Sequence, residues 1–282
     1  MLYQLPDSAI DAFLDEDMPY GDLTTHLLGI GNERGTISFI SREVITVCCT
    51  EEAARLLERC GATVTNMVAS GSVVQVGSEL LVANGSAAAL HAGWKVAMNL
   101  LEYASGIATR TRTIVEHATA VNPNVRLVTT RKSFPGTKKV AIKAIMAGGA
   151  LPHRLGLSES VLIFRQHTEF CGGLERLLAT LSSLKMELPE HKIMIEAETA
   201  DEALRIAAAG ADVVQLDKLP PAELQPLITK LRVIAPTITI SAAGGINAQN
   251  AADYAATGVD ILVLSSPYFG KPADIKVIMT SH

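Results

Sequence analysis

The sequence predicts an α/β protein in which an N-terminal α+β domain precedes a parallel, barrel-like sheet. From about residue 125, strand candidates alternate with helical stretches, which is typical of right-handed β-α-β units in a parallel sheet. Before that point, helices and strands follow one another without regular alternation. The expected strands of the second part span residues 125–130, 160–164, 192–196, 212–216, 237–241 and 260–264. A closed barrel has eight strands, so this shorter series means either an incomplete barrel or missed strands.

Helical stretches separate these strands at residues 173–187, 200–209, 222–234 and 248–256. In the first part, Asp7 is expected to cap a helix whose apolar face carries Ile10, Phe13 and Leu14. The other expected elements are strands at 36–41 and 44–49, a helix at 50–60 stopped by Gly61, short strands within 71–85, and a long helix from about 87 to 103 that ends near Ser105-Gly106.

Composition argues against several classes of function. Aromatic residues make up only 4% of the chain, which disfavours a base-stacking surface for single-stranded nucleic acid. The 24 basic and 29 acidic residues give a net charge of −5, so we expect no nucleic-acid partner. No apolar run reaches transmembrane length, and the first residues are acidic, unlike a signal peptide. The four cysteines show no CxxC pair and no metal-ligand spacing, which suits a reducing compartment, so we expect a cytoplasmic protein with no membrane partner.

Two loops that follow strand-like or helical stretches carry clustered cations. One contains Arg131 and Lys132, and the other, rich in glycine, contains His153 and Arg154. Arginine offers a planar fork that matches carboxylate or phosphate, and lysine adds a point charge. A solvated basic surface is the alternative interpretation. Because proline and glycine shape these loops, we favour a pocket for a ligand with several negative charges.

Charged residues recur just beyond the C-terminal ends of the expected strands, where parallel α/β barrels hold their active sites. Glu196 and Asp217 follow neighbouring strands and are suited to share a divalent cation or to hold ribose hydroxyls. Carboxylates that face a phosphate ligand commonly do so through Mg²⁺. The alternative for either residue alone is a simple ion pair.

A glycine loop and a pair of serines follow the last two strands. Ala243, Gly244 and Gly245 precede a helix, whose N-terminal N–H groups and dipole favour phosphate. Ser265 and Ser266 follow the next strand and are placed to close the same site, an arrangement that recurs in barrels. A tight turn is the alternative explanation of the paired glycines.

Taken in order, these motifs resemble the nicotinate-nucleotide pyrophosphorylases, also called quinolinate phosphoribosyltransferases. The matching segments are 16–25 (EDMPYGDLTT), 99–109 (NLLEYASGIAT), 130–136 (TRKSFPG), 148–157 (GGALPHRLGL), 196–198 (EAE), 216–217 (LD) and 257–260 (TGVD). They cover essentially the whole chain. Within the family, the sequence is most similar to the ModD branch associated with molybdenum-transport operons.

The resemblance implies an N-terminal α+β domain (residues 1–106) and an incomplete parallel α/β (TIM-like) barrel (residues 107–270). We expect residues 271–282 to pack back on the N-terminal domain. The resemblance also implies a homodimer with shared active sites, and Mg²⁺-dependent transfer of phosphoribosyl from phosphoribosyl pyrophosphate to a pyridine carboxylate. By the same resemblance, Arg131, His153 and Arg154 face the acidic substrate, Lys132 lies between it and the pyrophosphate, and Glu196 and Asp217 hold ribose or metal.

The sequence departs from the family at several site positions. The family's Lys-Asp-Asn-His begins here with Phe164 and Arg165, so an aromatic ring replaces a cation that meets a substrate carboxylate. Lys218 replaces the asparagine after the aspartate, and Ala243 replaces the first serine of the phosphate loop. Lys95 stands where the family's neighbour-subunit arginine would be. Because the ribose and metal carboxylates are kept while acceptor contacts change, an altered acceptor is expected.

The leading hypothesis is therefore a phosphoribosyltransferase that uses Mg²⁺ and acts on a small anionic or heteroaromatic acceptor, related to quinolinate but not necessarily quinolinate. One alternative is a non-catalytic protein that binds an oxyanion or nucleotide and is linked to molybdate uptake. Another is a Schiff-base aldolase that uses Lys132 or Lys218.

Overall fold

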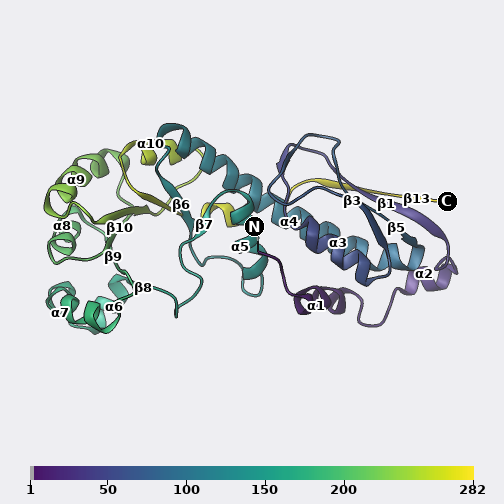
Figure 1. Ribbon diagram of the computed structural model, residues 1–282, viewed down its shortest axis with the longest axis horizontal. Coiled ribbons are helices and arrows are strands. Elements are labelled where there is room, and N and C mark those ends of the chain that lie inside the picture. The colour runs from purple at the N-terminus through teal and green to yellow at the C-terminus, as the bar shows by residue number, and fades with distance from the viewer. Residues whose placement is uncertain (1–2) are drawn as a thin grey trace. The chain divides into compact units, whose positions relative to one another are not determined.

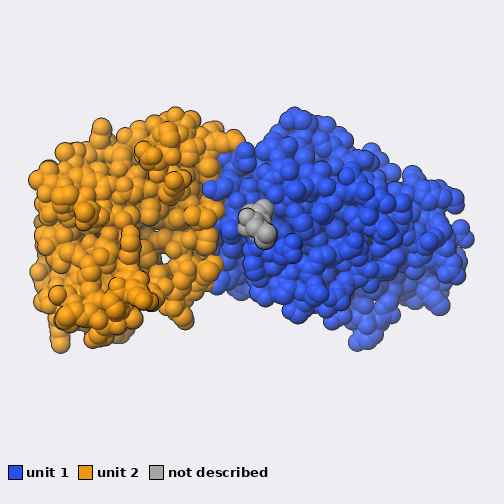
Figure 2. All heavy atoms as spheres, in the orientation of Figure 1, with its two compact units in different colours: residues 1–112, 133–149, 267–282 blue, residues 113–132, 150–266 orange. Residues whose placement is uncertain are grey.

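The computed structural model describes residues 3–282, which form two compact units (Figure 2). The first unit comprises the chain up to residue 112 together with residues 133–149 and 267–282. The second comprises residues 113–132 and 150–266. Residues 133–149 thus group with the first unit, whereas the sequence-based ranges put them in the barrel domain.

The first unit is built on a four-stranded antiparallel sheet with the strand order β13-β1-β5-β3 (Figure 1). Buried and half-exposed residues alternate along β1 (Arg34–Ser41), so one face of the strand is turned to the core. β1 pairs with β5 (Glu79–Ser86) and with β13 (Ile275–Ser281), which brings the C-terminal segment into the sheet. The unit's other elements are α1 (Asp7–Asp17), α2 (Leu23–Leu28), β2 (Ile45–Thr46), α3 (Thr50–Arg59), β3 (Thr63–Met67), β4 (Val73–Val74) and α5 (Lys138–Ala147).

A buried ion cluster joins α5 to α3. The Lys143 ammonium lies 2.5 Å from the Glu52 carboxylate and 2.9 Å from that of Glu51. Lys143 and Glu52 are almost completely buried, with exposed side-chain fractions of 1% and 0%. Glu52 also accepts a hydrogen bond from the backbone N–H of Leu5. A buried lysine is tolerated only with such partners.

The helix α4 (Ala87–Val121) continues far past the end that Ser105-Gly106 suggested. Ser105 is buried, and its hydroxyl oxygen accepts a hydrogen bond from the backbone N–H of Cys48. A Cβ at Gly106 would lie 3.0 Å from the backbone oxygen of Lys271. The small residues therefore permit close contact with neighbouring chain segments and do not end the helix.

Two other expectations for the first unit need correction. The N-cap of α1 is Pro6, and Asp7 lies in the first turn without capping the helix, although its charge there still favours the helix dipole. The strand expected at 44–49 is reduced to β2.

Across residues 3–282, no helix combines the length and the apolar character that a membrane crossing requires.

The second unit is a seven-stranded parallel sheet with the order β7-β6-β12-β11-β10-β9-β8, which confirms the predicted incomplete barrel. Among the strands of this unit, only β7 was not predicted, because its two residues are too few to produce a recognisable pattern. The strands are β6 (Arg126–Thr129), β7 (Leu151–Pro152), β8 (Val161–Ile163), β9 (Ile193–Ala197), β10 (Val213–Asp217), β11 (Thr239–Ala243) and β12 (Ile261–Leu264). The helices are α6 (Arg165–Phe170), α7 (Leu174–Glu187), α8 (Ala200–Ala208), α9 (Pro221–Ile234) and α10 (Ala251–Ala256), and a short 3₁₀ helix, η1, spans Ser266–Tyr268.

Candidate active site

Side chains alternate between the two faces of a strand, and this alternation places several polar side chains of the second unit in one cavity. Residues two apart on a strand share a face, so Gln215 and Asp217 on β10 point to the same side. Glu196 pairs in register with Gln215, and both line a cavity of about 780 Å³ together with Asp217. The cavity lies at the C-terminal ends of the strands and has the size of a small-molecule site, which is typically about 300–1,000 Å³.

Five residues able to carry positive charge line this cavity: Arg131, Lys132, His153, Arg154 and Lys218. Burial and the nearby charge of Arg131 lower the pKa of the Arg154 guanidinium, which still remains charged at neutral pH. Burial and the charge of Arg154 likewise lower the pKa of His153, against an opposing effect of Glu159. Among the carboxylates of residues 3–282, none forms an ion pair with Arg131, Lys132 or Arg154. These cations are therefore available to an anionic ligand.

The carboxylates of the cavity come from adjacent strands. Glu196 accepts a hydrogen bond of 2.8 Å from the Gln215 side-chain amide, and Asp217 lies 3.2 Å from the Lys218 ammonium. Burial raises the pKa of Glu196, the hydrogen bond from Gln215 opposes this, and the negative charge of Asp217 adds to the rise. Two neighbouring carboxylates of like charge favour the binding of a cation or of hydroxyl donors between them.

The backbone of Gly244 packs closely against the side chain of Lys218. Lys218 has a backbone φ of 59°, a conformation that residues other than glycine rarely adopt. Its N–H donates to the carbonyl oxygen of Ala243, and its side chain crosses Gly244 so closely that a Cβ there would lie 2.5 Å from Lys218 Cγ. Gly244 itself has φ 91°. Only glycine fits beneath Lys218, which explains one residue of the glycine pair.

The serines after β12 border the same cavity. The hydroxyls of Ser265 and Thr130 are 2.7 Å apart, and the Ser266 hydroxyl donates to the carbonyl oxygen of Ile246. Both serines line the cavity, as do Ala243, Gly244 and Gly245. The structure thus brings the glycine loop and the two serines together at one end of the half-barrel.

Phe164 lines the cavity and makes two ring contacts. Its ring stacks on the His167 imidazole at a centroid distance of 5.7 Å, and the Arg154 guanidinium lies over it at 5.6 Å. Arg165 does not line this cavity: its guanidinium pairs with Glu198 at 3.0 Å and is largely exposed. The neighbouring Gln166 lines the cavity in its place.

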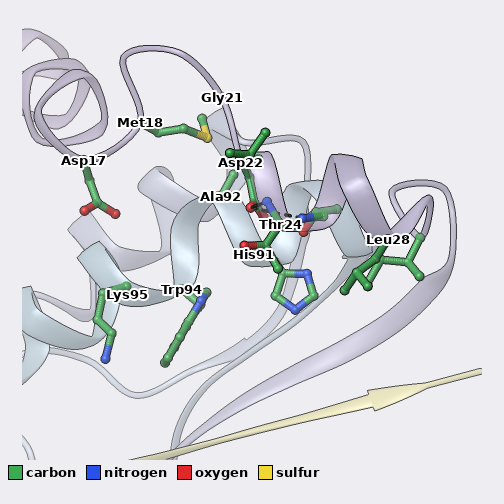
Figure 3. Close-up of a pocket in the computed structure, with 13 residues that line it drawn as sticks. Asp17, Met18, Gly21, Asp22, Thr24, Leu28, His91, Ala92, Trp94 and Lys95 are labelled. Carbon is green, nitrogen blue, oxygen red and sulfur yellow. Dashed lines mark hydrogen bonds between the residues drawn. The ribbon is translucent and has the colours of Figure 1, made fainter.

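Lys95 lies in the first unit, where it lines a different cavity of about 400 Å³ (Figure 3). Its ammonium is 4.4 Å from the centre of the Trp94 ring. Asp17 and His91 line the same cavity. The expectation that Lys95 serves the active site of a partner subunit stays a prediction.

Sequence reasoning missed Gln215, Gln166 and Asn247, which also line the cavity of the second unit. Gln215 carried a usable signal, because it precedes Asp217 by two positions in an otherwise apolar strand. Gln166, at the start of α6, and Asn247, in a loop, lie in polar segments and gave no such signal.

The cavity has carboxylates that could serve as ligands of Mg²⁺. No group of three or more His, Cys, Asp or Glu side chains within residues 3–282 is arranged to hold a metal on its own. Mg²⁺ is, however, usually bound by one or two carboxylates together with substrate phosphates and water. Glu196 and Asp217, placed in a cavity with phosphate-binding features, match that pattern.

Comparison with protein families gives two matches that together span most of the chain. The family described as "Quinolinate phosphoribosyl transferase, C-terminal domain" matches residues 107–277. The corresponding N-terminal domain family matches residues 22–105.

Relatives and solved structures agree with these matches. The chain is 45% identical to the "Putative pyrophosphorylase ModD" of Rhodobacter capsulatus, over 89% of this chain and 96% of that protein. It is 38% identical to the Pasteurella multocida protein of the same name, over 99% of each. The solved structure of the nicotinate-nucleotide pyrophosphorylase from Francisella tularensis superimposes with a TM-score of 0.88 at 22% identity, covering 98% of both chains.

Proposed function

The chain belongs to the quinolinate phosphoribosyl transferase family, and we propose that it transfers phosphoribosyl from phosphoribosyl pyrophosphate to a small anionic or heteroaromatic acceptor. One observation carries this proposal. The same cavity contains cations that have no carboxylate partner within residues 3–282 (Arg131, Lys132 and Arg154) and two neighbouring carboxylates (Glu196 and Asp217). The first suit phosphates and an acidic acceptor, and the second suit a ribose with its metal ion.

The sugar phosphate donor is held from two directions in this proposal. The glycine loop at Gly244 and Gly245, with Ser265 and Ser266, receives the terminal phosphate through backbone N–H groups and hydroxyls. Glu196 and Asp217 hold ribose hydroxyls and Mg²⁺. When bound, Mg²⁺ neutralises charge on the pyrophosphate leaving group.

The protein residues act mainly through electrostatics. Departure of pyrophosphate leaves positive charge at the anomeric carbon, which the carboxylates of Glu196 and Asp217 stabilise. The Lys132 ammonium meets the negative charge that builds on the departing pyrophosphate. Because these groups are fixed on strand ends and adjoining loops, little reorganisation accompanies the reaction.

Arg131, His153 and Arg154 hold the carboxylate of the acceptor in this proposal. The ring of Phe164 offers a flat apolar surface to a heteroaromatic ring, and it supplies no cation for a second carboxylate. An acceptor with one acidic group therefore suits the cavity better than quinolinate, which has two. We also infer a dimer, in which Lys95 of one subunit completes the site of the other.

The test is release of pyrophosphate from phosphoribosyl pyrophosphate in the presence of Mg²⁺ and a panel of pyridine and purine acids. Asp217→Asn is expected to lower turnover by about a hundredfold or more, because it removes charge stabilisation from the transition state. The fold should persist, since Asp217 lies at a strand end; circular dichroism provides that control. No pyrophosphate release with any acceptor would favour a non-catalytic oxyanion- or nucleotide-binding protein instead.

A further inference from the structure

The side chain of Gln215 contains a buried polar atom for which the residues that the structure describes provide no hydrogen-bond partner. Gln215 is only 4% exposed, and its amide nitrogen donates to Glu196. Within residues 3–282, its side-chain oxygen, Oε1, has no hydrogen-bond partner and is closed off from solvent. A buried acceptor without a partner is unfavourable, so natural proteins keep few of them.

The orientation of this amide is fixed by its neighbours. Glu196 is half-buried, and a carboxylate only accepts hydrogen bonds, so the Gln215 NH₂ group must face it. On the other flanking strand, Ser241 pairs in register with Gln215, but its hydroxyl donates to the carbonyl oxygen of Val214. Neither neighbour therefore supplies a donor to the Gln215 oxygen.

Gln215 lies one layer deeper than the strand end. It is two residues before Asp217 on the same strand face, and both residues line the candidate active-site cavity. The strand neighbours of Gln215 are otherwise buried and apolar, at Val214 and Leu216. A polar residue at the floor of a ligand cavity, with one half of its amide engaged and the other half free, has the features of a recognition group.

We infer that Gln215 determines specificity: its side-chain oxygen accepts a hydrogen bond from an N–H or O–H group of the bound ligand. Because this oxygen is closed off from solvent, the lining side chains must shift when the ligand enters for this hydrogen bond to form. The donor group belongs either to the ribosyl part of the sugar phosphate or to the acceptor ring. This inference rests on the proposed function, because it assumes that a ribosyl phosphate and a heteroaromatic acid occupy this cavity.

Two pairs of probes separate the two sources of the donor group. Ribose 5-phosphate and 2-deoxyribose 5-phosphate differ by one hydroxyl, and 6-hydroxynicotinate differs from nicotinate by an added donor group on the ring. Dissociation constants are measured by calorimetry, with Mg²⁺ present, for wild type, Gln215→Met and the control Gln225→Met. Gln225 is exposed on α9 and does not line the cavity, so this variant makes the same chemical change elsewhere.

Wild type and Gln225→Met should bind the donor-bearing member of one pair about tenfold more tightly than its partner. In Gln215→Met that preference should fall below about twofold, because no amide oxygen remains to accept a hydrogen bond from the additional donor group. If the variant loses the preference within the sugar pair, the hydrogen bond belongs to the ribosyl part. If it loses the preference within the ring pair, the hydrogen bond belongs to the acceptor. Gln215→Asn, which withdraws the amide by one methylene, should lose the preference too and serves if the methionine variant does not fold.

The same preference in wild type and in the Gln215 variants, or no preference in wild type for either pair, would overturn the inference while leaving the proposed function standing. Failure of wild type to bind any of the four probes would contradict the proposed function and this inference with it.

Discussion

Phe164 contributes the only phenylalanine ring among the residues lining the candidate active site, and it contacts the Arg154 guanidinium and the His167 imidazole. Its side chain cannot form a charge-assisted hydrogen bond. A second carboxylate on an acceptor would lose its water there without gaining a cation, at a cost on the order of a few kcal/mol. The cation that follows Phe164 in the sequence, Arg165, is already paired with Glu198 and Glu169.

Phe164→Lys is therefore expected to lower the KM for quinolinate by about tenfold, because it restores a donor for the second carboxylate. The KM for nicotinate, which has one carboxylate, should stay the same or rise, since the flat ring surface is lost. Steady-state kinetics of wild type and variant with both acids measure the difference. Efficient turnover of quinolinate by wild type, unchanged in the variant, would contradict this role of Phe164.

At the level of helices, the ion cluster between α3 and α5 is expected to affect stability, because Lys143 and Glu52 are almost completely buried. Burial alone raises the pKa of Glu51, but hydrogen bonds from the Ser70 hydroxyl and N–H and from Lys143 outweigh it and lower the pKa to about 2. Glu52, fully buried, has Lys143 as its ion-pair partner at 2.5 Å. The Glu51 carboxylate is thus charged in the folded protein, and both carboxylates contact the same ammonium group.

Lys143→Met is expected to reduce the free energy of unfolding of the first unit by about 3 kcal/mol or more, because it leaves Glu52 charged, buried and without its cation. The double variant Lys143→Met/Glu52→Gln should recover much of this loss, since it removes the unpaired charge as well. Urea denaturation of both variants and of wild type measures the effect. Equal losses in the single and double variants would mean that packing, and not the charge, accounts for the role of Lys143.

The sequence predicted the elements whose signal is local and missed those that depend on tertiary contacts. The strands of the half-barrel were found because each is a short apolar run next to turn-forming residues. The end of α4 was misjudged because Ser105 and Gly106 serve neighbouring segments, which sequence alone does not reveal. In the site, Gln215 was overlooked although it precedes Asp217 by two positions in an apolar strand, because only the structure reveals its partner across the sheet, Glu196.

For the molecule as a whole, the first unit exposes apolar side chains around α2 that a single chain leaves uncovered. Tyr20 is 99% exposed, Leu23 68% and Leu27 74%. The cavity that holds Lys95 is lined by Leu23 as well, so apolar surface and the candidate donated cation adjoin each other. Neighbouring exposed apolar residues of this kind mark protein interfaces. Together with the low charged fraction of 19%, this supports the proposed dimer with shared sites.

In such a dimer, each site combines Arg131 from one subunit with Lys95 from the other. Lys95→Ala and Arg131→Ala should each be nearly inactive alone, because each removes a cation from every site. When the two are unfolded together and refolded at equal amounts, half of the dimers are mixed, and each mixed dimer contains one intact site. About one quarter of wild-type activity should then return. No recovery of activity on mixing, or a monomer in sedimentation velocity, would show that Lys95 does not act across a subunit interface.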